Sequence, residues 1–176
     1  MKRHLIILTL LIAYAVALCG CSHSEENGRE ADKPLAIFPD YMDVTIPANI
    51  APLNFRIEGY TSKAQARFVS GESSIVITSA DSRIISPKRK WRKIIDAASS
   101  NNGIIEVIVS IQEEDGWVTY SPFKINVAAE PIDSHIAYRL IEPGYESWCE
   151  MGIYQRNIES FEQKPIIENS ESPLLI

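Results

Sequence analysis

Residues 105–127 of the chain read IEVIVSIQEEDGWVTYSPFKINV. Every second residue across Ile105–Ile111 is apolar, and this alternation is typical of a β-strand with one buried face. The Asp115-Gly116 pair is a turn signal, and apolar residues alternate again across Phe123–Val127. The stretch therefore predicts a β-hairpin, which is the clearest fold signal in the sequence.

Upstream of the hairpin, the same period of two recurs in shorter runs. Each run predicts a short strand with one face toward a core. About six short strands at intervals of roughly ten residues are typical of a β-sandwich. We therefore expect a mainly β fold, an immunoglobulin-like sandwich over residues 37–130, with Pro131 marking its boundary. The alternating apolar residues are Val44 and Ile46; Leu53, Phe55 and Ile57; Ala64, Ala66 and Phe68; and Ile75 and Ile77.

One segment between the predicted strands has a helical pattern instead. Its apolar residues recur at the i, i+3, i+4 and i+7 spacing of one helical face. Ser86 is suited to cap a helix and Pro87 to occupy its first position, while Asn102-Gly103 predicts the C-terminal cap. The sequence thus predicts one short helix within the sandwich. Its apolar face consists of Trp91, Ile94, Ile95 and Ala98.

The start of the chain predicts a lipoprotein signal peptide over residues 1–20. A basic Lys-Arg-His segment precedes an apolar run over residues 5–18, which is shorter than the roughly 20 residues of a membrane span. The run ends in Leu-Cys-Gly-Cys, which resembles the bacterial lipobox. We expect cleavage after Gly20 and a diacylglycerol, with palmitate-type chains, on Cys21. The alternatives are a plain secretory signal and an uncleaved short anchor.

The polar residues after the lipobox predict a flexible tether over residues 21–36. Acyl chains on Cys21 would hold the protein to one leaflet, so the membrane is its first expected partner. By resemblance to the sorting rule of such lipoproteins, Ser22 in place of Asp implies the outer membrane. We therefore expect an envelope protein that faces the periplasm or the cell surface.

Charge and cysteine content narrow the functional classes. The chain has 17 basic and 23 acidic residues, and loss of Lys2 and Arg3 with the signal leaves a net charge of −8. Such an acidic protein has no electrostatic basis for binding nucleic acid. Cys19 leaves with the signal and Cys21 carries lipid, so only Cys149 remains and no intrachain disulfide can form.

Few residues of the mature chain suggest chemistry. Its histidines are His23, in the tether, and His135. A hydrolase using Cys149 and His135 is a rival hypothesis, because a thiol and an imidazole within hydrogen-bond reach form a nucleophile pair. No set of these residues has the spacing of a zinc site, and no glycine-rich phosphate motif is present. We expect no catalysis, no metal and no cofactor.

Two groups of residues allow surface hypotheses. The basic run over residues 88–93 is either a solvated helix face or a contact for anionic lipid or an acidic partner. Trp117, Tyr120 and Trp148 are either core residues or stacking platforms for sugar rings. The basic residues of the run are Lys88, Arg89, Lys90, Arg92 and Lys93.

Three longer motifs resemble a known family. They are PDYMDVTIPANIAPLNF at residues 39–55, PID at 131–133 followed by YRLIEPGYE at 138–146, and MGIYQR at 151–156. These motifs resemble the N-terminal part of the TolB-like lipoproteins of Bacteroides-type bacteria, which are sometimes labelled cytochrome c biosynthesis proteins. The resemblance covers most of the mature chain up to Asn169. It implies a non-catalytic role in protein–protein interaction at the envelope.

In that family, a Cys-x-x-Cys-His segment and a β-propeller follow the leading module. Here the residues after Asn169 are Ser-Glu-Ser-Pro-Leu-Leu-Ile, so neither haem attachment nor propeller function is implied. We expect a truncated member whose residues 131–176 are a remnant of a propeller-docking segment. Its apolar residues must fold back on the sandwich, pair with another chain or stay exposed. They are Ile136, Tyr138, Leu140, Ile141, Tyr145, Trp148 and Ile153.

The sequence thus predicts a lipid-anchored envelope protein whose β-sandwich acts as an interaction or scaffold module. Residues 132–155 are the expected surface for a protein partner. One alternative is a glycan-binding surface lipoprotein. Another is a truncated gene product without a function of its own.

Overall fold

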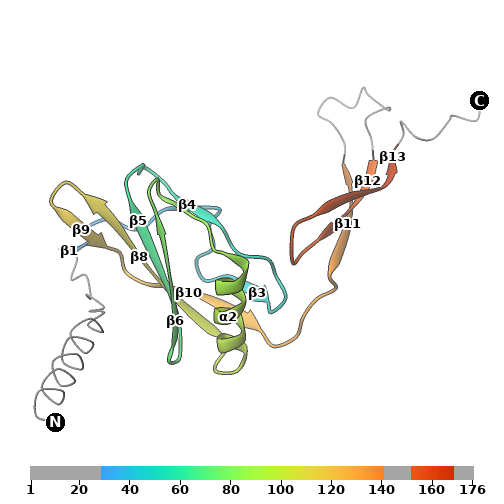
Figure 1. Ribbon diagram of the computed structural model, residues 1–176, viewed down its shortest axis with the longest axis horizontal. Coiled ribbons are helices and arrows are strands. Elements are labelled where there is room, and N and C mark those ends of the chain that lie inside the picture. The colour runs from blue at the N-terminus through green and yellow to red at the C-terminus, as the bar shows by residue number, and fades with distance from the viewer. Residues whose placement is uncertain (1–28, 141–151, 169–176) are drawn as a thin grey trace, which may run out of the picture.

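The computed structural model describes residues 29–140 and 152–168. The signal peptide, Cys21 and Cys149 lie outside the described residues. The structure is mainly β, with 50% of the described residues in strands and 9% in the helix α2. Figure 1 shows a sandwich that carries the helix, and a small further sheet beyond it toward the C-terminus.

A seven-stranded sheet forms the larger layer of the sandwich, with β8 (Ile104–Glu113) at its centre. β5 pairs antiparallel with one edge of β8, and β6 extends the sheet beyond β5. β9 and β10 share the other edge of β8, and β1 and β3 pair parallel to them. The bounds are β1 Arg29–Glu30, β3 Thr45–Pro47, β5 Ala64–Ser70, β6 Ser73–Ser79, β9 Gly116–Thr119 and β10 Phe123–Ala128.

The second layer is a three-stranded sheet in the order β2–β4–β7. In the constant type of immunoglobulin sandwich, the first, second, fourth and fifth strands share one sheet, and the third, sixth and seventh share the other. β2, β4 and β7 against β5, β8 and β10 follow this division, whereas the fourth strand, β6, pairs with β5 in the larger sheet. The predicted mainly β sandwich with one short helix is confirmed. The bounds are β2 Ile37–Phe38, β4 Phe55–Ile57 and β7 Arg83–Ile84.

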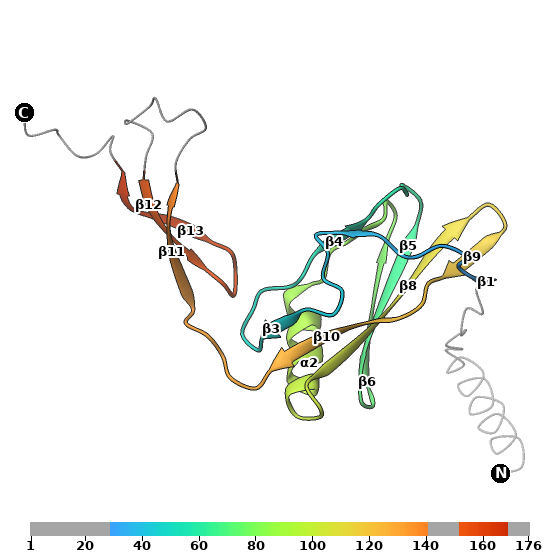
Figure 2. The same ribbon diagram turned by 180° about the vertical axis from the view of Figure 1, so that it is seen from behind.

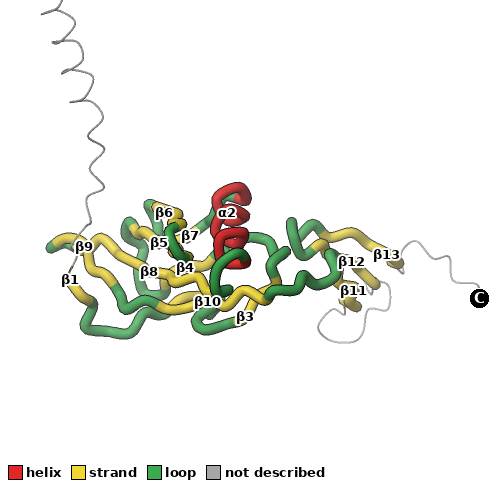
Figure 3. The backbone as a smooth tube through the Cα atoms, turned by 90° about the horizontal axis from the view of Figure 1, so that it is seen from below, coloured by secondary structure: helices red, strands yellow, loops and turns green. Residues whose placement is uncertain are grey.

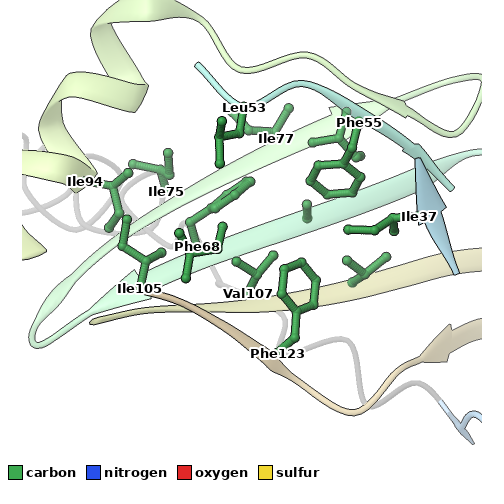
Figure 4. Close-up of a cluster of buried hydrophobic side chains, with 14 of the residues drawn as sticks. Ile37, Leu53, Phe55, Phe68, Ile75, Ile77, Ile94, Ile105, Val107 and Phe123 are labelled. Atoms are coloured by element: carbon green, nitrogen blue, oxygen red, sulfur yellow. The ribbon is translucent and has the colours of Figure 1, made fainter. Parts of the chain in front are cut away.

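The core lies between the two layers and contains the alternating residues that the sequence predicts. Phe68, Ile105 and Val107 are fully buried on the inner face of the large sheet. Phe55 meets Phe123 across the layers, edge to face, with 6.5 Å between ring centroids. Figure 4 shows these side chains gathered between the sheets. Each large apolar side chain buried in this way contributes about 1.5–3 kcal/mol.

The predicted hairpin is present, but its returning strand is broken in two. β9 pairs with the C-terminal half of β8, residues 110–113, and β10 pairs with its N-terminal half, residues 104–107. Between them the chain passes through Tyr120, Ser121 and Pro122. Pro122 has no N–H for a strand ladder, and the Tyr120 side chain is only 4% exposed. Each half of the returning strand then has its own parallel neighbour.

Helix α2 spans Lys88–Ser99 and buries the predicted apolar face on the core. The prediction that Ser86 caps it is wrong. The N-cap residue is Pro87, and the Ser86 hydroxyl is buried without a hydrogen-bond partner. The Ser86 N–H donates to the Asn54 side chain at 3.0 Å. This bond holds Ser86 beside the start of β4. Because α2 begins at Lys88, Ser86 lies one residue before the N-cap position and does not cap the helix.

The C-terminal end of α2 also differs from the prediction in detail. The capping residue is Ser100, which precedes the predicted Asn102-Gly103 cap. Gly103 still closes the end, because its N–H donates to the Ala98 carbonyl at 2.9 Å with φ at +70°. A side chain at Gly103 would place its Cβ 2.9 Å from the Val127 carbonyl oxygen. Glycine is therefore required there by both conformation and space.

The fold begins inside the range predicted as a tether. Arg29 and Glu30 pair with β9 as strand β1, and the Ala31 N–H donates to the Thr119 carbonyl at 2.9 Å. Leu35 packs against the core. Backbone hydrogen bonds form β1 regardless of its polar side chains, which is why composition did not indicate it. A free tether can extend only to residue 28.

Residues 135–168 contain a second three-stranded sheet, called here the C-terminal sheet, which the sequence analysis did not predict. Its strands are antiparallel neighbours in chain order. Figures 1 and 2 show that it projects from the sandwich at the end opposite β1 and β9. The bounds are β11 His135–Leu140, β12 Gly152–Asn157 and β13 Gln163–Glu168.

Besides the linker that leads into β11, one loop holds the C-terminal sheet to the sandwich. This loop, residues 48–51, is called here the joint loop, and it bonds to residues that flank β11 and β12. The Asn49 side chain donates to the Ile132 carbonyl at 2.8 Å and accepts from the Ile132 N–H at 3.2 Å. It thereby occupies both backbone groups of Ile132, as a neighbouring strand would. The Ala51 N–H donates to the carbonyl of Ile158, which is buried.

The joint loop is held from the other side by α2. The Trp91 indole N–H donates to the Ile50 carbonyl at 3.2 Å. The Arg92 guanidinium donates to the Ala48 carbonyl at 3.1 Å. The helix and the C-terminal sheet therefore share one loop, and a change in its position affects both.

Substituting Gly103 should cost more stability than substituting Gly59. Both have positive φ, which costs about 1 kcal/mol for a residue with a side chain. Only Gly103 has a backbone oxygen where the Cβ would lie, whereas Gly59 faces open space. We expect Gly59→Ala to lose about 1 kcal/mol and Gly103→Ala at least about 2 kcal/mol in urea unfolding. Equal losses would contradict the clash.

Asn49→Ala should loosen the C-terminal sheet and leave the sandwich intact. The variant loses both side-chain hydrogen bonds to Ile132, each worth about 0.5–1.5 kcal/mol. We expect faster hydrogen exchange at the Ile132 amide and a larger radius of gyration in X-ray scattering. Asn126→Ala, on β10, is the control. An unchanged radius and exchange rate would show that other contacts fix the sheet.

Candidate interaction surfaces

His135, half of the candidate nucleophile pair, begins β11. Its Nδ1 lies 2.9 Å from the Ser134 hydroxyl, and its Nε2 lies 3.3 Å from the Asn157 amide nitrogen. Cys149 lies outside the described residues, so the Cys149–His135 pair stays a prediction. Across residues 29–140 and 152–168, no group of three His, Cys, Asp or Glu side chains is placed to hold a metal ion.

The aromatic residues that the sequence offered for sugar stacking lie in different environments. Tyr120 is a core residue, and its hydroxyl donates to the Tyr60 hydroxyl at 2.7 Å. Burial, followed by the interactions with Tyr60, raises the pKa of Tyr120. Trp117 is half-buried, and the Lys63 ammonium lies 5.3 Å from its ring centroid. Trp148 lies outside the described residues.

A shallow depression of about 330 Å³ lies beside the sheet β2–β4–β7 of the sandwich. Its charged side chains are already paired, since Arg83 lies 3.1 Å from Asp81 and Arg56 lies 3.8 Å from Glu58. A hydrogen bond from Ser79, with further contributions from Arg83, lowers the pKa of Asp81. The depression therefore offers an incoming ligand no unpaired charge of either sign.

The C-terminal sheet carries most of the uncovered apolar surface. Seven of the nine exposed large hydrophobic side chains among the described residues belong to residues 132–168. Ile136 and Leu140 point to one face, because β-strand side chains alternate. Ile153 and Ile167 are cross-strand partners on the other face. The sheet thus presents apolar side chains on both faces, and all four are at least 40% exposed.

An aromatic pair stiffens one of these faces. Tyr138 and Tyr154 are directly opposed on β11 and β12, and their rings stack with centroids 6.1 Å apart. The Tyr138 hydroxyl donates to Gln163, and the Tyr154 hydroxyl donates to Glu168 at 3.0 Å. These bonds to β13 fix both rings, so the face with Ile136 is a preorganised surface.

The two outer edges of the C-terminal sheet have no strand neighbour among the described residues, but they differ. β13 contains Pro165, which cannot donate a backbone hydrogen bond, and its register with β12 shifts between Ile153 and Tyr154. Proline and irregular register both discourage strand addition. β11 has no proline and a continuous register. The edge open to a further strand is therefore that of β11.

The predicted basic run lies on α2, as the helical spacing required. Lys88, Arg89 and Lys93 are exposed. Lys90 donates to the Val76 carbonyl at 3.0 Å, and Arg92 donates to the joint loop. Within the described ranges, no ion pair joins any of these five side chains to an acidic residue.

Sequence reasoning missed Asn49, the residue that attaches the C-terminal sheet. Asn49 lies in the 39–55 motif, which carried the family resemblance but no residue role. The one signal in the sequence was the side-chain amide of Asn49 itself, which lies between Ala48 and Ile50 in the loop before β4. Such a residue often bonds to backbone groups, but its partner at Ile132 is 83 positions away.

The part of the chain that the structure describes contains no helix long and apolar enough to cross a bilayer. The TolB-like resemblance is not tested by the fold and stays a prediction. No protein-family model, curated protein or solved structure matches the chain.

Proposed function

We propose that this protein is a lipid-anchored module of the cell envelope that binds another protein and catalyses no reaction. The observation that carries the proposal is the C-terminal sheet, which exposes apolar side chains on both faces. It meets the sandwich through the joint loop, at Asn49 and Ala51. The resemblance of the 39–55 and 138–146 motifs to TolB-like lipoproteins supports the same role.

A sheet with a hydrophobic face normally buries that face against another layer. In this sheet Ile136 is 48% exposed on one face, and Ile167 is 52% exposed on the other. Uncovered apolar surface of this kind marks an interface or an aggregation site. Covering it would contribute roughly 25 cal/mol for each Å² removed from water. The exposed apolar side chains therefore favour a role in which β11–β13 bind a protein partner over one in which the sheet binds nothing.

The proposed lipid anchor and this surface lie at opposite ends of the molecule. The seven residues 22–28 separate Cys21 from β1 and span at most about 25 Å when extended. Figure 3 shows β1 at one end of the molecule and β11–β13 at the other. The membrane attachment and the proposed partner surface are thus separated, so neither blocks the other.

Glycan binding is the second candidate function, and Trp117 is the observation that favours it. This side chain keeps part of its ring exposed, with Lys63 beside it. If sugar binding is the function, Trp117→Ala should abolish retention on envelope polysaccharide, whereas changes in the C-terminal sheet should not. A truncated product without function predicts neither sugar nor protein binding.

Cys21→Ser should abolish membrane attachment. The proposed acyl chains each contribute about 0.8 kcal/mol per buried methylene, and the serine hydroxyl does not accept them through a thioether. We expect the wild type to incorporate an alkyne-labelled palmitate and to sediment with membranes. The variant should lose both properties. Cys149→Ser is the matched control and should behave as the wild type. Labelling of the Cys21→Ser variant would contradict the anchor.

A photo-crosslinking amino acid at Ile136 or Ile153 should yield a discrete protein adduct in intact cells. Both positions lie on the C-terminal sheet and are more than 40% exposed. The same probe at Arg67, an exposed position on the outer face of β5, is the control. We expect one adduct of the same mass from both test positions and none from position 67. Adducts of equal yield from all three positions would contradict a dedicated surface.

A further inference from the structure

The basic residues of α2 do not stabilise the helix that carries them. α2 has five basic residues and one acidic residue, Asp96, in a chain that is acidic overall. Its first turn contains Lys88, Arg89 and Lys90 and no acidic residue, and positive charge at a helix N-terminus opposes the helix dipole. Arg89 and Lys93 are like charges at i and i+4, which is also unfavourable. Helix stability therefore does not account for this cluster.

Three of the five cations are available to a partner. Lys90 and Arg92 donate to carbonyls of the sandwich. Lys88, Arg89 and Lys93 are exposed, and no ion pair holds them to another described residue. Figure 3 shows α2 standing out from the strands on one side of the molecule. These three side chains are thus exposed cations on a helix that stands out from the strands.

An exposed apolar residue precedes these cations in the chain. Ile85 precedes Lys88 by three positions, and its side chain is 62% exposed, the largest exposed fraction among the exposed large hydrophobics. Its neighbour Ile84 is fully buried in β7, so the chain direction forces Ile85 outward. Cations beside an uncovered apolar side chain are the combination with which peripheral helices contact lipid headgroups and the acyl boundary.

We propose that the face of α2 formed by Lys88, Arg89 and Lys93, with Ile85 at its start, binds the anionic phospholipid headgroups of the membrane that anchors the chain. This inference rests on the lipid anchor proposed above. The anchor makes the contact intramolecular and so raises its effective concentration. Each cation near an anionic surface strengthens binding about fivefold. Three cations bind weakly by themselves but are enough to orient a protein that is already tethered.

Acidic residues near α2 offset its charge only in part. The one acidic residue of the helix, Asp96, is exposed three positions after Lys93 and leaves α2 with five basic residues against one acidic. The acidic turn Glu113–Asp115 lies at the β8–β9 end, whereas α2 packs on β5, β6, β8 and β10. At physiological ionic strength the screening length is about 8 Å, so charges at the far end contribute little at α2. With α2 against the bilayer, the long axis of the molecule lies along the membrane, and the C-terminal sheet stays near its surface.

The test uses the mature chain from position 21 with Cys21→Ser, so that no acyl chain contributes to binding. Its binding to vesicles containing about one third phosphatidylglycerol is compared with binding to pure phosphatidylcholine vesicles at low salt. The test variant is Arg89→Glu with Lys93→Glu, which preserves helix propensity. The matched control is Arg67→Glu with Lys164→Glu, an equal charge change on β5 and β13. Circular dichroism verifies that each variant is folded.

We expect binding to the anionic vesicles only, with at least tenfold weaker affinity for the α2 variant and less than a twofold change for the control. Equal losses in both variants would show that net charge alone matters and would overturn the proposal. Binding to soluble polyglutamate but not to vesicles would overturn it in favour of an acidic protein partner. Because no lipid is attached in this assay, neither failure bears on acylation at Cys21 or on the C-terminal sheet.

Discussion

Burial of one face of β8 is the constraint on which the rest of the molecule depends. Ile105, Val107 and Val109 alternate along this strand and are completely inaccessible to solvent. β5 pairs along one edge of β8, and the two halves of the returning strand, β9 and β10, share the other edge. The three-stranded sheet β2–β4–β7 then covers the buried face. Helix α2 fills the remaining gap with Trp91, whose ring meets Phe68 edge to face at 6.1 Å.

The elements that follow from burial were predictable from the sequence, because burial imposes a period. The alternation in β5 and β8 and the helical face around Trp91 predict the sandwich and the helix from the sequence alone. Features that depend on a single hydrogen bond produce no periodic pattern of residues in the sequence. The Ser86 N–H bonds to the Asn54 side chain, and the helix begins after Pro87. Backbone pairing alone forms β1. Neither leaves a local pattern in the sequence.

The candidate surface was predicted in part for the same reason. Ile136 and Ile153 stood out in the sequence as apolar residues without an assigned place, but their arrangement in a sheet did not. β13 contains Pro165 and an extra residue opposite β12, and both disrupt the alternation that identifies a strand. Asn49 lies in the joint loop, where contacts from α2 and from the C-terminal sheet meet. Such a tertiary contact between distant positions is visible only in the fold.

The shortness of β1 has a mechanical consequence. β1 is two residues long and pairs with β9 directly after the segment that leads from Cys21. If Cys21 carries lipid, as proposed, tension on the chain would act on these few hydrogen bonds before it reaches the buried Ile37. Release of β1 would add residues 29–36 to the segment between Cys21 and the sandwich, and the extended reach of that segment would rise from about 25 to about 50 Å. β1 would then give way to load before the buried core of the sandwich does.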